Sequence, residues 1–300
     1  MKKVRLRVWT AALVAAAALN LIAWEPSAAA EIAGTFALAG GTPAAQAHLV
    51  ATPQRDPLHV KLDYWLTRTS GGQVVRAYTT EMTKKLHLIA IGADFTTFLH
   101  VHPQLARDGH FSIVVALPHA GRYYLYADDQ PASLPKQVFR FPLDAGAVGP
   151  VQQNLHPTGN VVTAGPYLIS LSSTALRAGD LTMLTVHIRK HGKPAGDLQA
   201  YLGAPAHAVF INAATLDYVH VHPMALGAMG ENDTGGMGNM DGMTMGNMNM
   251  GAMHMADLHG AVSPDMMLHV VVPRSGVYKM WLQFLGGGNL YVAPFVLNAR

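Results

Sequence analysis

One pattern of three histidines occurs twice in this chain of 300 residues. In each copy a first histidine precedes a His-Val-His-Pro run, by 13 residues to the first histidine of the run and by 15 to the second. The six residues are His87, His100, His102, His207, His220 and His222. Neutral imidazoles in threes suit copper, zinc or nickel, and identical spacing in two places indicates a repeated structural unit. The pattern therefore predicts metal ligands carried by two homologous domains.

A β-hairpin would bring each set of three imidazoles together. Residues two apart on a strand face the same side, so His100 and His102 point the same way. A turn centred between residues 93 and 94 would place His87 opposite His100, and one centred between 94 and 95 would place it opposite His102. A turn centred on residue 94 alone would send His87 to the other face. The alternative is a structural hydrogen-bond network of histidines at the domain interface, and the spacing leaves open whether the two triads form two sites or one.

A methionine-rich segment lies within an insertion at residues 226–260 that only the second copy carries. Nine methionines fall within the 27 residues 229–255, separated mainly by Gly, Asn and Asp, so the segment is too polar to pack as a core and is expected to be disordered. Thioethers are soft ligands that suit Cu(I) or Ag(I). A low-complexity linker or a sticky methionine surface is the alternative. The predicted ligands here are Met237, Met240, Met243, Met245, Met248, Met250, Met253, His254 and Met255.

The two ligand types together favour copper over zinc. Thioether sulfur suits Cu(I), and imidazole suits both Cu(I) and Cu(II), whereas zinc gains little from thioether. The chain has no cysteine, which excludes a blue-copper centre, disulfide bonds and an anchor through an N-terminal cysteine. No Gly-x-Ser-x-Gly or His-Glu-x-x-His run is present, so nothing in the sequence points to a hydrolase.

The rest of the chain is typical of β-sandwiches. Short β-favouring runs recur about every ten residues with Gly and Pro between them, and no strongly periodic helix is present beyond the N-terminal segment. We expect an all-β protein with two tandem immunoglobulin-like sandwiches. The expected strands are 58–66, 86–91, 97–102, 111–117, 122–127, 167–172, 181–189, 207–212, 218–222, 267–272 and 277–284.

The first 30 residues read as a secretory signal peptide. Four basic residues precede a mostly apolar run at 8–24, and Ala28-Ala29-Ala30 offers a cleavage site before Glu31. Cleavage removes four basic residues and one acidic residue, which brings the formal net charge from +3 to zero and leaves no basic stripe for nucleic acid. We expect a periplasmic or secreted protein with no membrane span in the mature chain. The expected divisions are a signal peptide at 1–30, a flexible leader at 31–47, domain 1 at 48–142, a linker at 143–160 and domain 2 at 161–300.

Two stretches carry a resemblance to a known group of proteins. They are Lys-Leu-His-Leu-Ile-Ala-Ile at 85–91 with Phe-Leu-His-Val-His-Pro at 98–103, and Tyr-Leu-Gly-Ala-Pro-Ala-His at 201–207 with Tyr-Val-His-Val-His-Pro at 218–223. They resemble secreted bacterial proteins found with copper resistance or heavy-metal efflux, whose domains are similar to YtkA-like and FixH-like immunoglobulin-like sandwiches. The methionine insertion resembles the Met-rich loops of periplasmic copper-resistance proteins and copper-tolerance oxidases. The resemblance covers about residues 50–142 and 160–300.

Three functions compete at this point. The leading interpretation is a non-enzymatic periplasmic protein that sequesters or delivers copper, with metal ions and a copper-efflux or copper-oxidase protein as its partners. The second is an exported interaction module of a metal-efflux system whose histidines are structural. The third is a cysteine-free copper-dependent oxidase.

Overall fold

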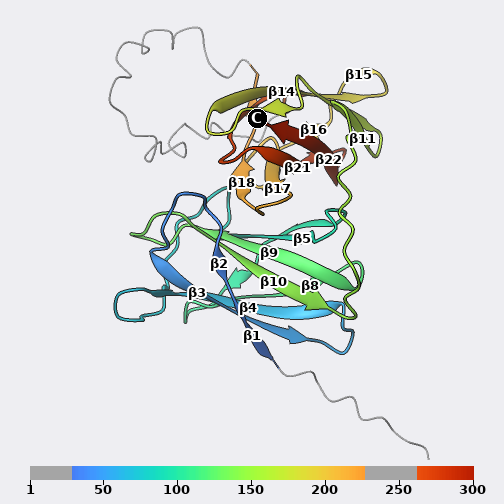
Figure 1. Ribbon diagram of the computed structural model, residues 1–300. Helices are drawn as coiled ribbons and strands as arrows, with labels where there is room; N and C mark the ends of the chain where they lie inside the picture. The colour runs from blue at the N-terminus through green and yellow to red at the C-terminus, as the bar shows by residue number, and fades with distance from the viewer. Residues whose placement is uncertain (1–28, 227–261) are drawn as a thin grey trace, which may run out of the picture.

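The structure is a computed structural model that describes residues 29–226 and 262–300. The signal peptide predicted at 1–30 falls outside the described residues, except for its last two positions. The predicted methionine ligands and His254 also fall outside them. The described chain folds into two β-sandwiches, one after the other in sequence (Figure 1). Within these ranges no helix has the length and apolar character needed to cross a bilayer.

Domain 1 consists of two five-stranded sheets packed face to face. The alternation in residues 59–68 buries Val60, Leu62, Tyr64 and Leu66 against the opposite sheet and turns the residues between them outward. The first sheet has the order β1-β3-β4-β8-β7, formed by Ala30–Ala33, Ala45–Pro53, His59–Arg68, Phe111–Ala116 and Gln104–Leu105. The second has the order β2-β10-β9-β5-β6, formed by Thr35–Phe36, Gln137–Ala145, Gly121–Asp129, Leu86–Gly92 and Phe98–Val101.

Domain 2 repeats this arrangement. One sheet has the order β11-β12-β14-β20-β19, formed by Val161–Ala164, Tyr167–Leu171, Leu181–Lys190, Asp265–Val271 and Met224–Ala225. The other has the order β13-β22-β21-β17-β18, formed by Ala175–Leu176, Asn289–Ala299, Gly276–Gly286, His207–Asn212 and Tyr218–Val221. Two short strands, β15 (Lys193–Pro194) and β16 (Leu198–Gln199), pair with β14 and β21.

The strand order identifies both sandwiches as immunoglobulin-like. In that fold strands A, B, E and D form one sheet, while G, F and C form the other, with an added C′ strand in the variable type. Here β3, β4, β8 and β7 take the A-B-E-D positions, and β10, β9, β5 and β6 take G-F-C-C′. Domain 2 has the same order in β12, β14, β20, β19 and β22, β21, β17, β18. The predicted fold class is confirmed.

The prediction of a flexible leader at residues 31–47 is wrong. Strand β1 pairs with β3, β2 pairs with β10, and β3 already begins at residue 45. This segment escaped prediction because its strands are short and rely on backbone pairing to neighbours rather than on an alternating apolar pattern.

The linker, predicted at 143–160, starts three residues later in the structure, at residue 146, since β10 continues to residue 145. Asn154 in the linker donates its backbone N–H to the carbonyl of Asp94 at 2.7 Å, and this hydrogen bond holds the linker against domain 1.

The two domains pack through their G-F-C-C′ sheets, which face each other in Figure 1. Strands β5 and β17 are buried along their whole length, because one face covers the core of its own domain and the other meets the partner domain. The contacts are reciprocal: Phe98 stacks on Trp281 with ring centroids 5.3 Å apart, and Tyr218 stacks on Tyr126 at 5.0 Å. Phe98 and Tyr218 are equivalent in the repeat, as are Tyr126 and Trp281. The interface is therefore pseudo-symmetric, like the isologous contact of a dimer.

The methionine insertion enters domain 2 between strands β19 and β20. The backbone N–H of Leu226, the first residue of the insertion, donates to the carbonyl of Asp265 at 3.0 Å, so the chain leaves and returns at adjacent points of one sheet edge. The equivalent connection in domain 1, between β7 and β8, takes only residues 106–110. The insertion thus lengthens one loop and leaves the repeated strands in place.

Candidate metal centre

The hairpin register places each histidine triad on one face of its sheet. Leu88 pairs with Val101, and by continuation His87 stands opposite His102, which is the register of a turn centred between residues 94 and 95. In domain 2, Ala208 pairs with Val221, which gives the same relation between the histidines there. The third register considered, which would have turned His87 away, does not occur. In both domains the histidines share the face that meets the partner domain, whereas the neighbouring side chains point into their own core.

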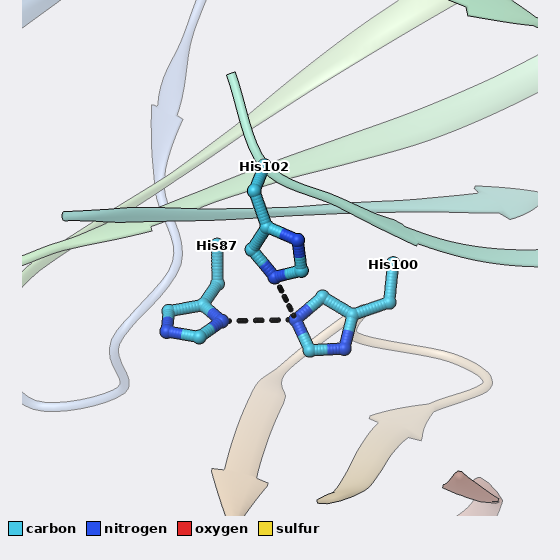
Figure 2. Close-up of side chains that lie close together, drawn as sticks. All are labelled: His87, His100 and His102. Atoms are coloured by element: carbon cyan, nitrogen blue, oxygen red, sulfur yellow. Dashed lines mark hydrogen bonds between the residues drawn. The ribbon is translucent and has the colours of Figure 1, made fainter. Parts of the chain in front are cut away.

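The three imidazoles of domain 1 converge on one point, as Figure 2 shows. His87 Nδ1 lies 2.9 Å from His100 Nε2, and His102 Nε2 lies 3.2 Å from the same atom. Nitrogens bound to one tetrahedral metal ion at about 2.0–2.1 Å stand about 3.3 Å apart. The spacing is therefore close to that of a three-nitrogen metal site, and the three residues satisfy the distances required of a ligand group.

The outer hydrogen bonds of this triad determine which nitrogens carry protons. His87 Nε2 donates to the backbone carbonyl of Glu81 at 3.0 Å, which leaves a lone pair on Nδ1. His100 Nδ1 donates to the side-chain oxygen of Gln283, from domain 2, at 2.8 Å, which leaves a lone pair on Nε2. The two facing nitrogens, 2.9 Å apart, are then both acceptors in the neutral rings. Such a contact is repulsive unless a cation lies between the nitrogens, and fixing ligand tautomers in this way is typical of metal sites.

The triad of domain 2 has the same design. His207 Nδ1 lies 3.3 Å from His220 Nε2, and His207 Nε2 donates to the carbonyl of Tyr201 at 2.9 Å. His220 Nδ1 donates to a carboxylate oxygen of Asp128, from domain 1, at 3.3 Å. The third histidine of the pattern, His222, has a buried Nε2 with no hydrogen-bond partner. The free nitrogens of His207 and His220 face each other, but the third residue with a ligand atom within 4.8 Å of both is His100 of domain 1 rather than His222.

The two triads form a single six-histidine cluster across the domain interface. The ring of His100 lies 5.2 Å from that of His207 and 5.5 Å from that of His220, and these three residues form a second group with ligand atoms within 4.8 Å of one another. Because Nδ1 of His100 donates its proton to Gln283, only Nε2 is available as a metal ligand, and it can bind one ion as a terminal ligand. The triads therefore face each other, which the sequence had left open.

Burial favours the neutral form, which binds metal, of the five histidines whose pKa it lowers: His87, His100, His102, His207 and His222. His87 is 2% exposed, His207 0% and His100 7%. Burial lowers the pKa of His102 to about 3 and that of His207 to about 3, with neighbouring histidines adding to the effect. The pKa values of His87, His100 and His222 are lowered by the same causes.

Asp128 is a functional residue that sequence reasoning missed. It lies on β9 directly opposite His87, and its carboxylate accepts hydrogen bonds from His220 and from the hydroxyl of Tyr218, the latter at 2.9 Å. Lys136 lies 2.9 Å from its other oxygen and 3.0 Å from Glu81. Burial alone would raise the pKa of Asp128, but Lys136 and the bond from His220 lower it, so the carboxylate is charged. The repeat could have located this position, since Asp128 and Gln283 are equivalent residues on the F strands.

Comparison with known proteins supports the repeat and assigns no activity. No curated protein matches the chain. Among solved structures, the chain is similar to Escherichia coli alpha-2-macroglobulin activated by porcine elastase, with 10% sequence identity and a TM-score of 0.24. That match covers 86% of this chain but 24% of the other, so the chain spans about a quarter of that protein's length. A family model matches residues 58–145 and 161–300, and by this match the chain belongs to the family described as Domain of unknown function (DUF8832).

Proposed function

We propose that this protein is an exported copper-binding protein that sequesters or delivers copper through its six-histidine cluster and methionine-rich segment. The observation that carries the proposal is the pair of facing nitrogen atoms in each triad. In both domains, hydrogen bonds at the far side of the rings turn two lone pairs toward each other. A purely structural network would place a proton donor between such nitrogens. Neutral imidazoles in this arrangement are organised for a cation.

The choice of copper rests on the whole set of ligands that the chain offers. Imidazoles alone would serve zinc or nickel as well. The nine methionines of the segment 229–255 add soft sulfur, which suits Cu(I), and no cysteine is available for a thiolate zinc site. Periplasmic location is part of the proposal and follows from the signal-like N-terminus. Mass spectrometry of protein recovered from the periplasm should give a mature N-terminus near Glu31.

Burial favours binding over catalysis. A catalytic metal site keeps a coordination position open to water or substrate. Here the strands of both domains cover the cluster, and the first histidine of each triad, His87 or His207, is almost completely buried. We infer storage or transfer of the ion itself, with copper as cargo.

Metal titration of the mature protein tests this proposal. Wild type is compared with His87→Gln/His100→Gln/His102→Gln, with a variant whose nine segment methionines are changed to Gln, and with His59→Gln, an exposed histidine of domain 1, as matched control. Cu(I) is measured by competition with a chromophoric chelator, Cu(II) by electron paramagnetic resonance, and Zn²⁺ in parallel. The triad variant should lose tight copper binding and the segment variant should lose Cu(I) equivalents, while His59→Gln matches wild type.

Three results would decide against the proposal. Unchanged copper stoichiometry and affinity in both ligand variants would leave the histidines as a structural network of an interaction module. Tighter binding of Zn²⁺ than of either copper ion would overturn the choice of metal. Multiple turnovers with a phenol or a cuprous substrate would favour the oxidase instead.

A further inference from the structure

A second group of soft side chains lies on the opposite side of domain 2 from the histidine cluster. Strands β14, β20 and β19 turn Met183, Met224, Met267 and His269 to the outer face of their sheet, away from the domain core. Met183 is 62% exposed, and the other three are partly exposed. Exposed methionines in such number are uncommon on a sheet surface that covers nothing in the described chain, because a polar residue would do equally well there.

The register brings these side chains together. Met224 stands directly opposite Met267, and Met183 directly opposite His269. Opposed residues on one face of antiparallel strands have Cβ atoms about 4.5–5.5 Å apart. His269 Nε2 lies 3.0 Å from the sulfur of Met267, two residues before it on the same strand. Two thioethers and one imidazole thus share a small area at the edge of the sheet.

Domain 1 supplies an internal comparison for this face. Its equivalent pairs are Gln104 with Ser112, and Lys61 with Val114. All four soft side chains of domain 2 are therefore replaced by residues that do not bind soft metals, although the backbone pairing is the same. The fold does not require methionine or histidine at these positions. The soft residues occur in the one copy that also carries the methionine insertion, which begins two residues after Met224 and ends seven residues before Met267.

We propose that Met224, Met267 and His269 form a surface site for one soft monovalent cation, Cu(I) or Ag(I). The two sulfurs and His269 Nε2 supply a three-coordinate set of soft and borderline ligands, and Met183 lies beside them as a further thioether. The ring binds as the neutral tautomer with its proton on Nδ1. Because the site is open to solvent, it accepts and releases an ion without domain separation. It uses none of the residues of the histidine cluster, so it stands independently of the proposed function.

Silver titration of the full-length mature protein, labelled with ¹³C at the methionine methyl groups, tests this site. The methyl signals are assigned with single Met→Leu variants, in chloride-free buffer. We expect the signals of Met224 and Met267 to move together as Ag(I) is added. Met266 and Met280, which are completely buried in the core of domain 2, serve as internal controls and should not move. His269→Val, which installs the residue of domain 1, should weaken the response of both reporter methionines by about tenfold or more.

The outcomes separate this site from the other metal ligands of the chain. The swap Met224→Gln/Met267→Ser/His269→Val should lower the total stoichiometry by one Ag(I), and His100→Gln should leave the response of Met224 and Met267 unchanged. If the methyl signals of Met224 and Met267 do not shift when the protein is saturated with Ag(I), the site is overturned. Responses that shift independently, or that His269→Val leaves untouched, would identify separate surface thioethers and overturn it as well.

Discussion

The two histidine triads have the same hairpin register but differ in what supports His100 and His220. His100 donates Nδ1–H to Gln283 of domain 2, and His220 donates Nδ1–H to Asp128 of domain 1. The acceptors are equivalent residues of the repeat, so each domain supports the central histidine of the other. One acceptor is a neutral amide, and the other is a carboxylate held by Lys136 and Tyr218.

This difference changes how strongly the imidazole of His100 or His220 would donate electrons to a metal ion bound at its triad. A carboxylate that accepts from a metal-bound imidazole makes the ring a stronger base, whereas an amide has a weaker effect. We therefore expect the domain 2 triad to prefer the more highly charged ion, Cu(II), and the domain 1 triad to accommodate Cu(I) more readily. The repeat gives both triads one hairpin register, and a single difference on the F strand, Asp128 against Gln283, makes their supporting residues unequal.

Acid should have the largest effect, and it acts on both triads. The lowered pKa values of His87, His100, His102, His207 and His222 mean that these rings stay neutral in the folded protein while the unfolded chain protonates them below about pH 6.5. The contribution of these neutral rings to the free energy of unfolding is therefore fully present above pH 6.5. It is lost as pH falls toward about 3, the pKa of His102 and His207. Each such group costs up to about 1.4 kcal/mol per pH unit.

Denaturant unfolding of the metal-free protein between pH 7.5 and about 5.5 measures this effect, above most of the range in which ordinary carboxylates titrate. Wild type should lose several kcal/mol over this range by the same rule. The variants His87→Gln/His100→Gln/His102→Gln and His207→Gln/His220→Gln/His222→Gln should each show a flatter dependence. A slope equal to that of wild type in both variants would contradict the role of the buried neutral rings.

Loss of a central ligand should be the next largest effect, and it should be local. His100→Gln removes the nitrogen that His87 and His102 both face in domain 1, and His220→Gln removes the nitrogen that His207 faces in domain 2. Each change should weaken copper binding at its own triad by about 100-fold or more, since loss of even a supporting partner costs 10–100-fold. Titration followed by histidine NMR signals resolves the two triads. Equal loss at both sites from either change would mean that one shared ion occupies the cluster.

Changing the supporting carboxylate should have a smaller effect with a clear direction. Asp128→Asn should weaken Cu(II) binding at the domain 2 triad by about 10–100-fold and leave Cu(I) binding at domain 1 nearly unchanged. Because this change also leaves Lys136 without a buried partner, Asp128→Asn/Lys136→Met is the matched control for charge balance. Gln283→Glu should do the reverse and raise Cu(II) affinity at His100. Absence of any change in the Cu(II) to Cu(I) preference would remove the distinction between the triads.

Much of this arrangement follows from the sequence. The repeat, the immunoglobulin-like fold and the shared face of each triad depend on local spacing, and local spacing is visible in a single chain. The turn chosen in the hairpin was one of two that the spacing allowed. The strands β10 and β22, which close the G-F-C-C′ sheets, were not predicted, although residues 139–145 of β10 alternate between buried and less buried side chains.

The pairing of the two triads could not be predicted from the strand pattern alone. It depends on contacts between residues that are more than 90 positions apart, such as His220 with Asp128 and His100 with Gln283. One signal was nevertheless present. Residues 88–91 are apolar without interruption, which indicates a strand covered on both faces and therefore a second layer over the first triad.

The smallest expected effect comes from the aromatic residue that precedes the central histidine by two positions. Tyr218 donates its hydroxyl to Asp128 at 2.9 Å, whereas the equivalent residue of domain 1 is Phe98. Tyr218→Phe therefore gives domain 2 the residue that domain 1 has at this position, and it keeps the stacking on Tyr126.

Loss of the hydrogen bond from Tyr218 to the charged carboxylate should cost about 1.5–3 kcal/mol of stability. Copper affinity at the domain 2 triad should change by less than about tenfold, because Lys136 and His220 still hold the carboxylate. Isothermal titration at fixed pH measures that change, with Tyr124→Phe on β9 of domain 1 as the control. A larger loss of affinity than in Asp128→Asn would mean that Tyr218, rather than the carboxylate charge, distinguishes the two triads.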